Sequence, residues 1–208
     1  MNSFHKLLFL IPILISGCKS TEVVDKITTQ TINSLNMNIY SNEGKILLSI
    51  NSPYSSYDKE KNIFNLKKTK INLFKNNESE YIIISDNSKL SNNNKLLVLN
   101  GNVLVESSNE KESKLYANSF TWNIQNSEYL LVGNVNFQND TITLSSNKAI
   151  LNRTNNIIEF FNPVKYKIND INNERGYEIN SENAYYNIDT RSVSFKSREK
   201  KVRSKIYF

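Results

Sequence analysis

Cysteine and histidine are almost absent from this 208-residue chain, which contains one of each, Cys18 and His5. A single cysteine cannot form an internal disulfide bond, so a disulfide framework is excluded. Both residues lie close to the N-terminus, next to or within a segment that we predict to be removed. The mature chain would then lack the histidine and the free thiol on which most acid-base, nucleophilic and zinc chemistry depends.

Glycine and proline are also scarce, with five and three residues, while aromatic residues make up 11% of the chain. This composition argues against a disordered protein. A hydrophobic content of 38% is enough for one sizeable core. The apolar run from Leu7 to Ile15 is too short to cross a bilayer, which needs about 20 residues. No glycine-rich phosphate-binding loop is present.

The N-terminus has the pattern of a secretion signal. Lys6 precedes the apolar run, and Ile15-Ser16-Gly17-Cys18 follows it. These four residues resemble a bacterial lipobox, in which the cysteine is acylated and becomes the first residue. We therefore predict a lipoprotein signal peptide over residues 1–17, lipid attachment at Cys18, and a polar tether over residues 18–38. An uncleaved anchor, or a secretion signal with an incidental cysteine, are the alternatives.

Between Lys95 and Asn152 a strand-like pattern occurs twice. Apolar residues recur at every second position, which is typical of strands with one buried face. The first copy comprises Leu97, Leu99, Gly101, Val103 and Val105, then Leu115, Ala117, Phe120 and Trp122; the second comprises Tyr129, Leu131, Gly133, Val135 and Phe137, then Ile142, Leu144, Ser146, Ala149 and Leu151. The glycines would leave room along this face.

A degenerate third copy follows. Ile158, Phe160, Val164 and Tyr166 match the glycine-centred strand, and Ile179, Ser181, Ala184 and Tyr186 match the second strand. A period of about 30 residues indicates stacked two-strand units. Inward-facing residues of a regular strand are two positions apart, but at one place in each unit they are three apart. This happens between Ala117 and Phe120, between Ser146 and Ala149, and between Ser181 and Ala184, and it predicts a bulge or corner in each unit.

Four shorter runs precede the clear repeats: Lys45 to Ile50, Asn62 to Leu66, Lys70 to Phe74 and Tyr81 to Ser85. We interpret them as an irregular version of the same pattern. The prediction is an all-β fold, an elongated antiparallel β-sandwich or open β-jellyroll of stacked two-strand repeats, over residues 39–195, with a basic tail over residues 196–208.

The repeated Gly-x-Val strands, Gly101-Asn102-Val103 and Gly133-Asn134-Val135, followed by segments that end in an aromatic residue and Asn, resemble the OstA-type repeat of the lipopolysaccharide-transport proteins LptC, LptA and the amino-terminal part of LptD. The order of anchor, tether, irregular first half and repeats is most similar to LptC. The resemblance covers about residues 40 to 195. LptC proteins typically carry a transmembrane helix, and the lipobox departs from that pattern.

The resemblance implies a non-catalytic periplasmic protein that accepts lipopolysaccharide from an inner-membrane ABC transporter complex and passes it to a bridging β-jellyroll protein by strand addition. It implies attachment to the inner membrane through the lipid anchor. The interior that would hold the acyl chains is one inward stripe: Val103, Val105, Leu115, Phe120, Trp122, Leu131, Val135, Phe137, Ile142, Leu144, Ala149 and Leu151. From the residues alone, this stripe fits a filled core as well as an open channel.

The C-terminus provides a second candidate site. Val193, Ser194 and Phe195 end the last repeat, where an open sheet would accept a partner strand. The basic residues that follow suit lipid phosphates or an anionic membrane surface, or guard an edge strand against aggregation; they are Lys196, Arg198, Lys200, Lys201, Arg203 and Lys205, against Glu199 alone.

No catalytic residue, metal site or cofactor is predicted, and the secretion signal disfavours nucleic acid. A glycosidase that uses paired carboxylates stays formally open. Its candidates lie in turns or at polar positions where solvated charges are ordinary: Glu106, Glu128, Asp140 and Glu159. A surface or periplasmic β-repeat lipoprotein that binds protein or polysaccharide, without a transport role, is the other alternative.

Overall fold

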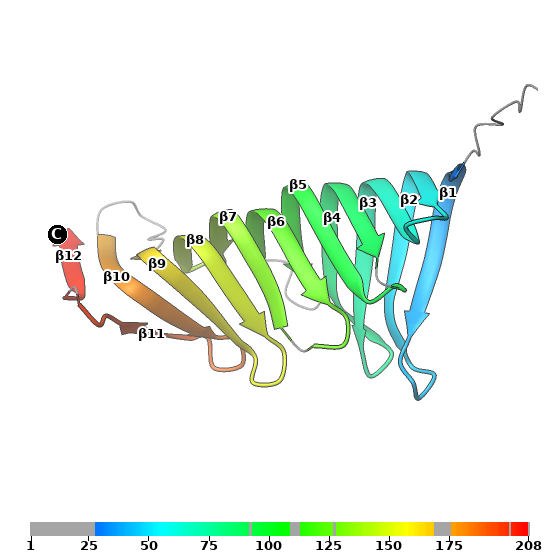
Figure 1. The fold of residues 1–208 in the computed structure, drawn as a ribbon. Helices are drawn as coiled ribbons and strands as arrows, with labels where there is room; N and C mark the ends of the chain where they lie inside the picture. The colour runs from blue at the N-terminus through cyan, green and yellow to red at the C-terminus, as the bar shows by residue number, and fades with distance from the viewer. Residues whose placement is uncertain are drawn as a thin grey trace, which may run out of the picture.

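The protein is a single elongated antiparallel β-sheet that bends back on itself, as seen in a computed structural model (Figure 1). The structure describes residues 28–91, 93–108, 113–126, 128–168, 176–199 and 201–207. Strand β1 lies at one end of the molecule and β12 at the other. The predicted all-β, open-jellyroll class is confirmed.

Twelve strands make up this sheet. Their bounds are β1 Thr29–Tyr40, β2 Ile46–Asp58, β3 Ile63–Lys75, β4 Glu78–Ser91, β5 Leu96–Ser107, β6 Lys114–Asn123, β7 Glu128–Gln138, β8 Ile142–Asn152, β9 Ile157–Ile168, β10 Gly176–Asn187, β11 Ser192–Lys196 and β12 Arg203–Tyr207. Each strand from β1 to β10 pairs with the next in sequence. Strand β12 pairs with the first half of β10, and β11 pairs with its second half.

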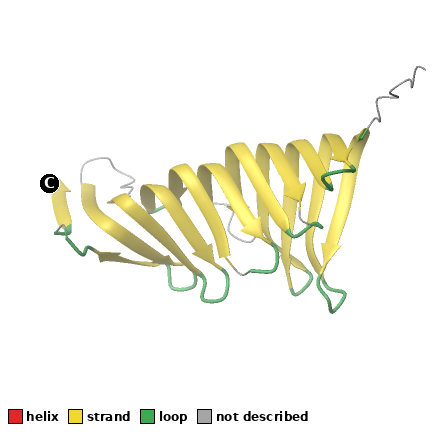
Figure 2. Cartoon of the chain, in the orientation of Figure 1, coloured by secondary structure: helices red, strands yellow, loops and turns green. Residues whose placement is uncertain are grey.

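The described residues form strands and connecting loops (Figure 2). None of them belongs to a helix of the length and apolarity that crossing a membrane requires.

The strands bend where the predicted parity change occurs. In β6, Ala117 and Phe120 are both buried although three positions separate them, and the pairing with β7 shifts between Tyr116 and Ser119. The same register shift occurs between Ser145 and Lys148 in β8. The extra residue lets the inward face continue around the corner. The predicted corners are confirmed.

The glycines of the repeats form these corners rather than widening the interior. Gly101 and Gly133 both have a φ of 78°, and Asn102 and Asn134 after them are also left-handed. A side chain at Gly133 would meet Asn118, which is exposed on the outer face. The expectation that these glycines leave room for a ligand was therefore wrong, because their missing side chains point outward.

One apolar core runs along the inside of the bent sheet. All twelve residues of the inward stripe belong to it, with side chains at most 7% exposed. The third repeat contributes Ile158, Phe160, Val164 and Tyr166 to the same core. The shared inward face of the three repeats is confirmed.

The ends of the folded body differ from the prediction. Strand β1 begins at Thr29, so residues 29–38 are part of the sheet and not of a tether. Strand β1 pairs with β2 although most of its residues are polar, and its apolar residues are half-buried. The predicted basic tail is likewise partly structured, since residues 203–207 form β12. The signal peptide and Cys18 lie outside the described residues.

The first half of the chain is more continuous than predicted. The runs Asn62 to Leu66 and Lys70 to Phe74 belong to the single strand β3, and β2 and β4 also extend well beyond their apolar runs. The polar segment inside β3 is a corner, where Lys68 has a φ of 50° and Thr69 is buried.

Candidate functional site

The two halves of the bent sheet meet along a seam formed by the turns. In an antiparallel meander, turns after odd-numbered strands lie on one side and turns after even-numbered strands on the other. Because the strands bend, turns of the two rows come into contact. Arg153, in the turn after β8, reaches Phe74 and Glu80 beside the turn after β3. Asn139, after β7, donates to the Tyr186 hydroxyl at 3.4 Å.

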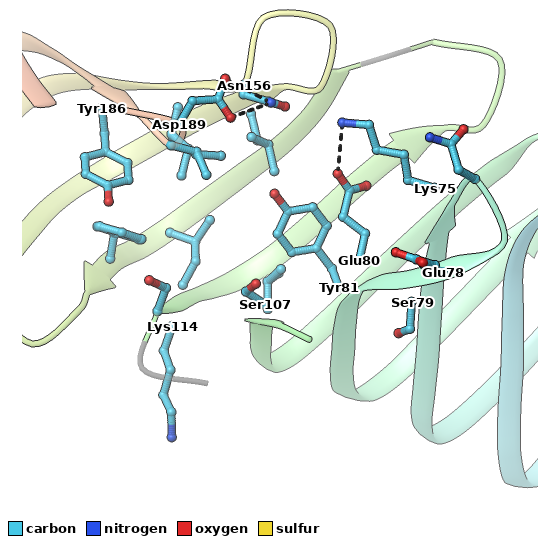
Figure 3. Close-up of a pocket in the computed structure, with 18 residues that line it drawn as sticks. Lys75, Glu78, Ser79, Glu80, Tyr81, Ser107, Lys114, Asn156, Tyr186 and Asp189 are labelled. Carbon is cyan, nitrogen blue, oxygen red and sulfur yellow. Dashed lines mark hydrogen bonds and ion pairs between the residues drawn. The ribbon is translucent and has the colours of Figure 1, made fainter. Parts of the chain in front are cut away.

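A pocket of about 340 Å³ opens on this seam (Figure 3). Its inner wall contains core residues from six strands. They are Val105, Leu115, Phe137, Leu151, Ile158 and Tyr186, and the first four belong to the predicted stripe. Polar side chains of the turns, among them Lys75, Glu80 and Asp189, surround the mouth. The pocket thus joins the apolar interior to the solvent.

An ion pair crosses the seam at the mouth of the pocket. The Arg153 guanidinium donates a hydrogen bond to the Glu80 carboxylate and another, at 3.4 Å, to the backbone carbonyl of Phe74. The second oxygen of Glu80 lies 3.5 Å from the Lys75 ammonium (Figure 3). The Arg153 and Glu80 side chains are 20% and 17% exposed, so solvent screens their interaction only in part.

The Arg153 guanidinium also covers a core aromatic residue. It lies 5.8 Å from the ring centroid of Tyr129, which is 1% exposed. Burial lowers the pKa of Arg153, but Tyr129 and Glu80 outweigh it and raise that pKa above its ordinary value. Burial raises the pKa of the Tyr129 hydroxyl. Arg153 is therefore charged and Tyr129 neutral at physiological pH.

Two other charged groups at the mouth, Lys114 and Asp189, have partners of their own. Lys114 pairs with Glu106 at 3.3 Å, and the Asp189 carboxylate accepts hydrogen bonds from Asn156 at 2.9 and 3.2 Å. Glu106 is thus explained by a surface ion pair rather than by acid-base chemistry.

The remaining carboxylates of the glycosidase alternative are also surface groups. Glu128 accepts a hydrogen bond from Asn152 at 3.3 Å, Glu159 accepts one from Asn183 at 3.5 Å, and Asp140 is exposed. Within the part of the chain that the structure describes, no three histidine, cysteine or acidic residues gather as metal ligands would.

The eight other stripe residues lie in the packed core and do not line the pocket; they are Val103, Phe120, Trp122, Leu131, Val135, Ile142, Leu144 and Ala149. Trp122 is 2% exposed, and its indole N–H donates to the Asn126 carbonyl at 3.0 Å. The structure therefore separates Trp122, inside the packed part, from Phe137, at the pocket. The sequence did not point to Lys75, Glu80 or Arg153, because isolated charges beside turns carry no pattern.

The predicted partner edge is an outer edge of the sheet. Strand β11 pairs with β10, and Val193 and Phe195 are half-buried while Ser194 is exposed. The Phe195 ring packs edge-on against Tyr166 at 5.2 Å. The opposite edge is β1, which among the described strands pairs with β2 alone.

Part of the basic segment is tied to the same region. The backbone N–H of Arg198 donates to the Glu182 carboxylate at 2.7 Å, and Arg203 and Lys205 lie exposed on β12. Lys200 lies outside the described residues.

Two comparisons with known proteins gave a match. The family model for "Lipopolysaccharide-assembly, LptC-related" proteins matches residues 15–129. A similar solved structure is that of LptH from Pseudomonas aeruginosa, described as the LptA homologous periplasmic component of the conserved lipopolysaccharide transport device. It shares 14% identity, with a TM-score of 0.49 over 62% of this chain and 94% of that one. No curated protein matches. The family match spans more than half of the sequence, so this chain belongs to the LptC-related lipopolysaccharide-assembly family, whose members are periplasmic components of lipopolysaccharide transport.

Proposed function

We propose that this protein accepts lipopolysaccharide acyl chains through the seam pocket and passes the lipid to a bridging protein of the same fold, without catalysis of its own. The observation that carries this proposal is the pocket itself, which joins the solvent to a continuous apolar core. Its volume of about 340 Å³ lies within the range of small-molecule sites. Its apolar wall suits an acyl chain, since each buried methylene group gains about 0.8 kcal/mol.

The described core is closely filled away from the pocket, with many side chains at 0% exposure. Carriage of an acyl chain would therefore require the two rows of turns to separate and the interior to widen. The polar sugars of the lipid would stay outside, because burying unpaired hydroxyl groups costs about 1–3 kcal/mol each. The pocket at the seam combines an apolar interior with an exit for a polar headgroup.

The partners follow from the family and from the two free edges of the sheet. Delivery would come from an inner-membrane ABC transporter complex, with Cys18 holding the protein at that membrane through its lipid. The bridging partner would add a strand at the edge that contains Val193, Ser194 and Phe195. The backbone N–H and C=O groups on the outer side of an edge strand can form hydrogen bonds with a partner strand.

Site-specific photo-crosslinking in cells tests the carriage of lipid. A photoreactive residue at Phe137, which lines the pocket, should capture lipopolysaccharide. The same residue at Asn134 or Asn136, on the outward parity of the same strand, should not. A photoreactive residue at Trp122, inside the packed core, should capture lipid only if the interior opens beyond the pocket.

Equal capture at Phe137 and Asn134, or capture at none of the four positions, would contradict the proposal. The interior would then be a packed core alone.

A further inference from the structure

The ion pair at the pocket mouth is placed to hold the seam shut. Arg153 and Glu80 are 73 residues apart, and they join the turn after β8 to the start of β4. The backbone of Glu80 is held in place, because its carbonyl accepts a hydrogen bond from the backbone N–H of Ser108 at 2.9 Å. The two rows of turns share no backbone ladder at this point, so side chains fasten them.

Two cations share one carboxylate at this contact. Arg153 and Lys75 each lie on a different oxygen of Glu80. Glu78 also lines the pocket and forms no ion pair with either cation among the described residues. Asp189 lines the pocket as well, so the rim as a whole has no excess of positive charge. Lys75 can nevertheless neutralise Glu80 if Arg153 leaves it, and Arg153 is then available to an anionic group of a ligand whose apolar chain enters the pocket.

We propose that Arg153 and Glu80 form a latch beside the seam pocket, and that a phosphate group on a lipid head releases it by taking Arg153 from Glu80, which keeps Lys75 as its counter-charge. The inference rests on the proposed carriage of acyl chains and adds how the seam opens. Glu80 acts as an internal substitute for the phosphate while no ligand is present. Once Arg153 binds the headgroup and Lys75 stays on Glu80, the turn after β8 is free to move away and the acyl chain enters sideways.

The chemistry of the groups supports this exchange. A phosphate offers more acceptor oxygens and more charge than a carboxylate, and a guanidinium binds it through two parallel hydrogen bonds. One guanidinium nitrogen of Arg153 donates to both Glu80 and Phe74. These two hydrogen bonds therefore use only part of the donors of the guanidinium group. Lys75 is half-exposed and serves as a mobile point charge that neutralises Glu80 after Arg153 has left it.

The experiment measures how fast the full-length protein, with a photoreactive residue at Phe137, captures lipid A or the same lipid without its phosphates. In the wild type, we expect the phosphorylated lipid to be captured about tenfold faster, a difference that corresponds to about 1.4 kcal/mol. Glu80→Gln weakens the latch without changing its shape, so capture of the dephosphorylated lipid should rise about tenfold. Arg153→Gln should raise it as well and should also abolish the preference for phosphate.

Glu178→Gln is the matched control. Glu178 is 16% exposed, close to the 17% of Glu80, and pairs with Lys165 at 3.2 Å between neighbouring strands away from the seam. This variant should behave like the wild type. Thermal unfolding of each variant verifies that it is folded.

The possible failures are distinct. If lipid is captured but Glu80→Gln leaves the rate for the dephosphorylated lipid unchanged, or Arg153→Gln keeps the phosphate preference, the latch is refuted while carriage stands. If neither lipid is captured by any variant, both the latch and the proposed carriage are refuted.

Discussion

Replacing Gly133 by alanine should destabilise the fold more than the same change at Gly44. Both glycines are left-handed, with φ of 78° and 77°. The difference lies in their surroundings. A Cβ atom at Gly44 would have no heavy atom within 4 Å, whereas one at Gly133 would lie 2.8 Å from Nδ2 and 3.0 Å from Cβ of Asn118. The pair of variants therefore separates backbone strain from close approach of neighbouring strands.

The magnitudes follow from these two contributions. A left-handed conformation costs a residue with a Cβ about 1–2 kcal/mol, and this is the whole expected loss at Gly44. At Gly133 the Cβ of Asn118 cannot rotate away, because it is fixed to the backbone of β6. Overpacking of this kind costs about 1–3 kcal/mol more. We therefore expect a total loss of about 2–5 kcal/mol for Gly133→Ala.

Urea unfolding of the wild type and both variants measures these losses from the shift in midpoint at constant slope. A third variant, Gly133→Ala combined with Asn118→Gly, removes the atom that is approached too closely. Relative to Asn118→Gly alone, its further loss should fall to about the value for Gly44→Ala. Equal losses for Gly44→Ala and Gly133→Ala would refute the explanation of the repeated glycine by close approach at the corner.

Three further predictions can be checked independently. Cys18→Ser should abolish labelling by a palmitate analogue and release the protein from membranes; equal labelling of wild type and variant would contradict the lipobox. Ser194→Pro in β11 removes a backbone donor and should weaken docking of the bridging partner by about two decades in a pull-down if the loss is about 3 kcal/mol. Undiminished binding by a folded variant would place the docking edge elsewhere. Asp58 has a lowered pKa because it accepts hydrogen bonds from the backbone N–H groups of Lys61 and Glu60. A lowered pKa in the folded state means that its contribution is present at neutral pH and is lost as the pH falls through the folded pKa. Asp58→Asn should therefore lose less stability than the wild type between pH 7 and pH 3, and an unchanged pH profile in urea unfolding would contradict this.

The second half of the chain could be predicted closely because the corners of β6, β8 and β10 each keep at least one apolar inward residue. Around the corner of β6, Ala117 and Phe120 both face inward. The alternation therefore stays visible on both sides of the three-residue step, and the step itself can be read as a bulge. The glycines mark the matching corners in the strands before and after β6.

The first half hides the same corners because hydroxyl residues occupy them. Ser52 and Ser55 in β2 and Ser85 and Ser88 in β4 are buried and three positions apart. The hydroxyl of Ser52 donates to the Lys67 carbonyl at 2.8 Å, and those of Ser85 and Ser88 contact each other at 2.8 Å. Internal hydrogen bonds make such burial tolerable. In the sequence, however, each buried hydroxyl reads as a break between two short runs.

The seam could not be predicted from the sequence for a different physical reason. Strand pairing leaves periodic traces along the chain, because backbone ladders require alternating burial over many residues. A seam between two rows of turns requires only a few side chains, each at a single position, and their partners can be anywhere in the sequence. Arg153 and Glu80 satisfy that requirement at a separation of 73 residues. On the proposed function, opening this line would break contacts between side chains and leave the backbone ladders intact. Substitutions in the turns should therefore alter access to the interior while the strands remain paired.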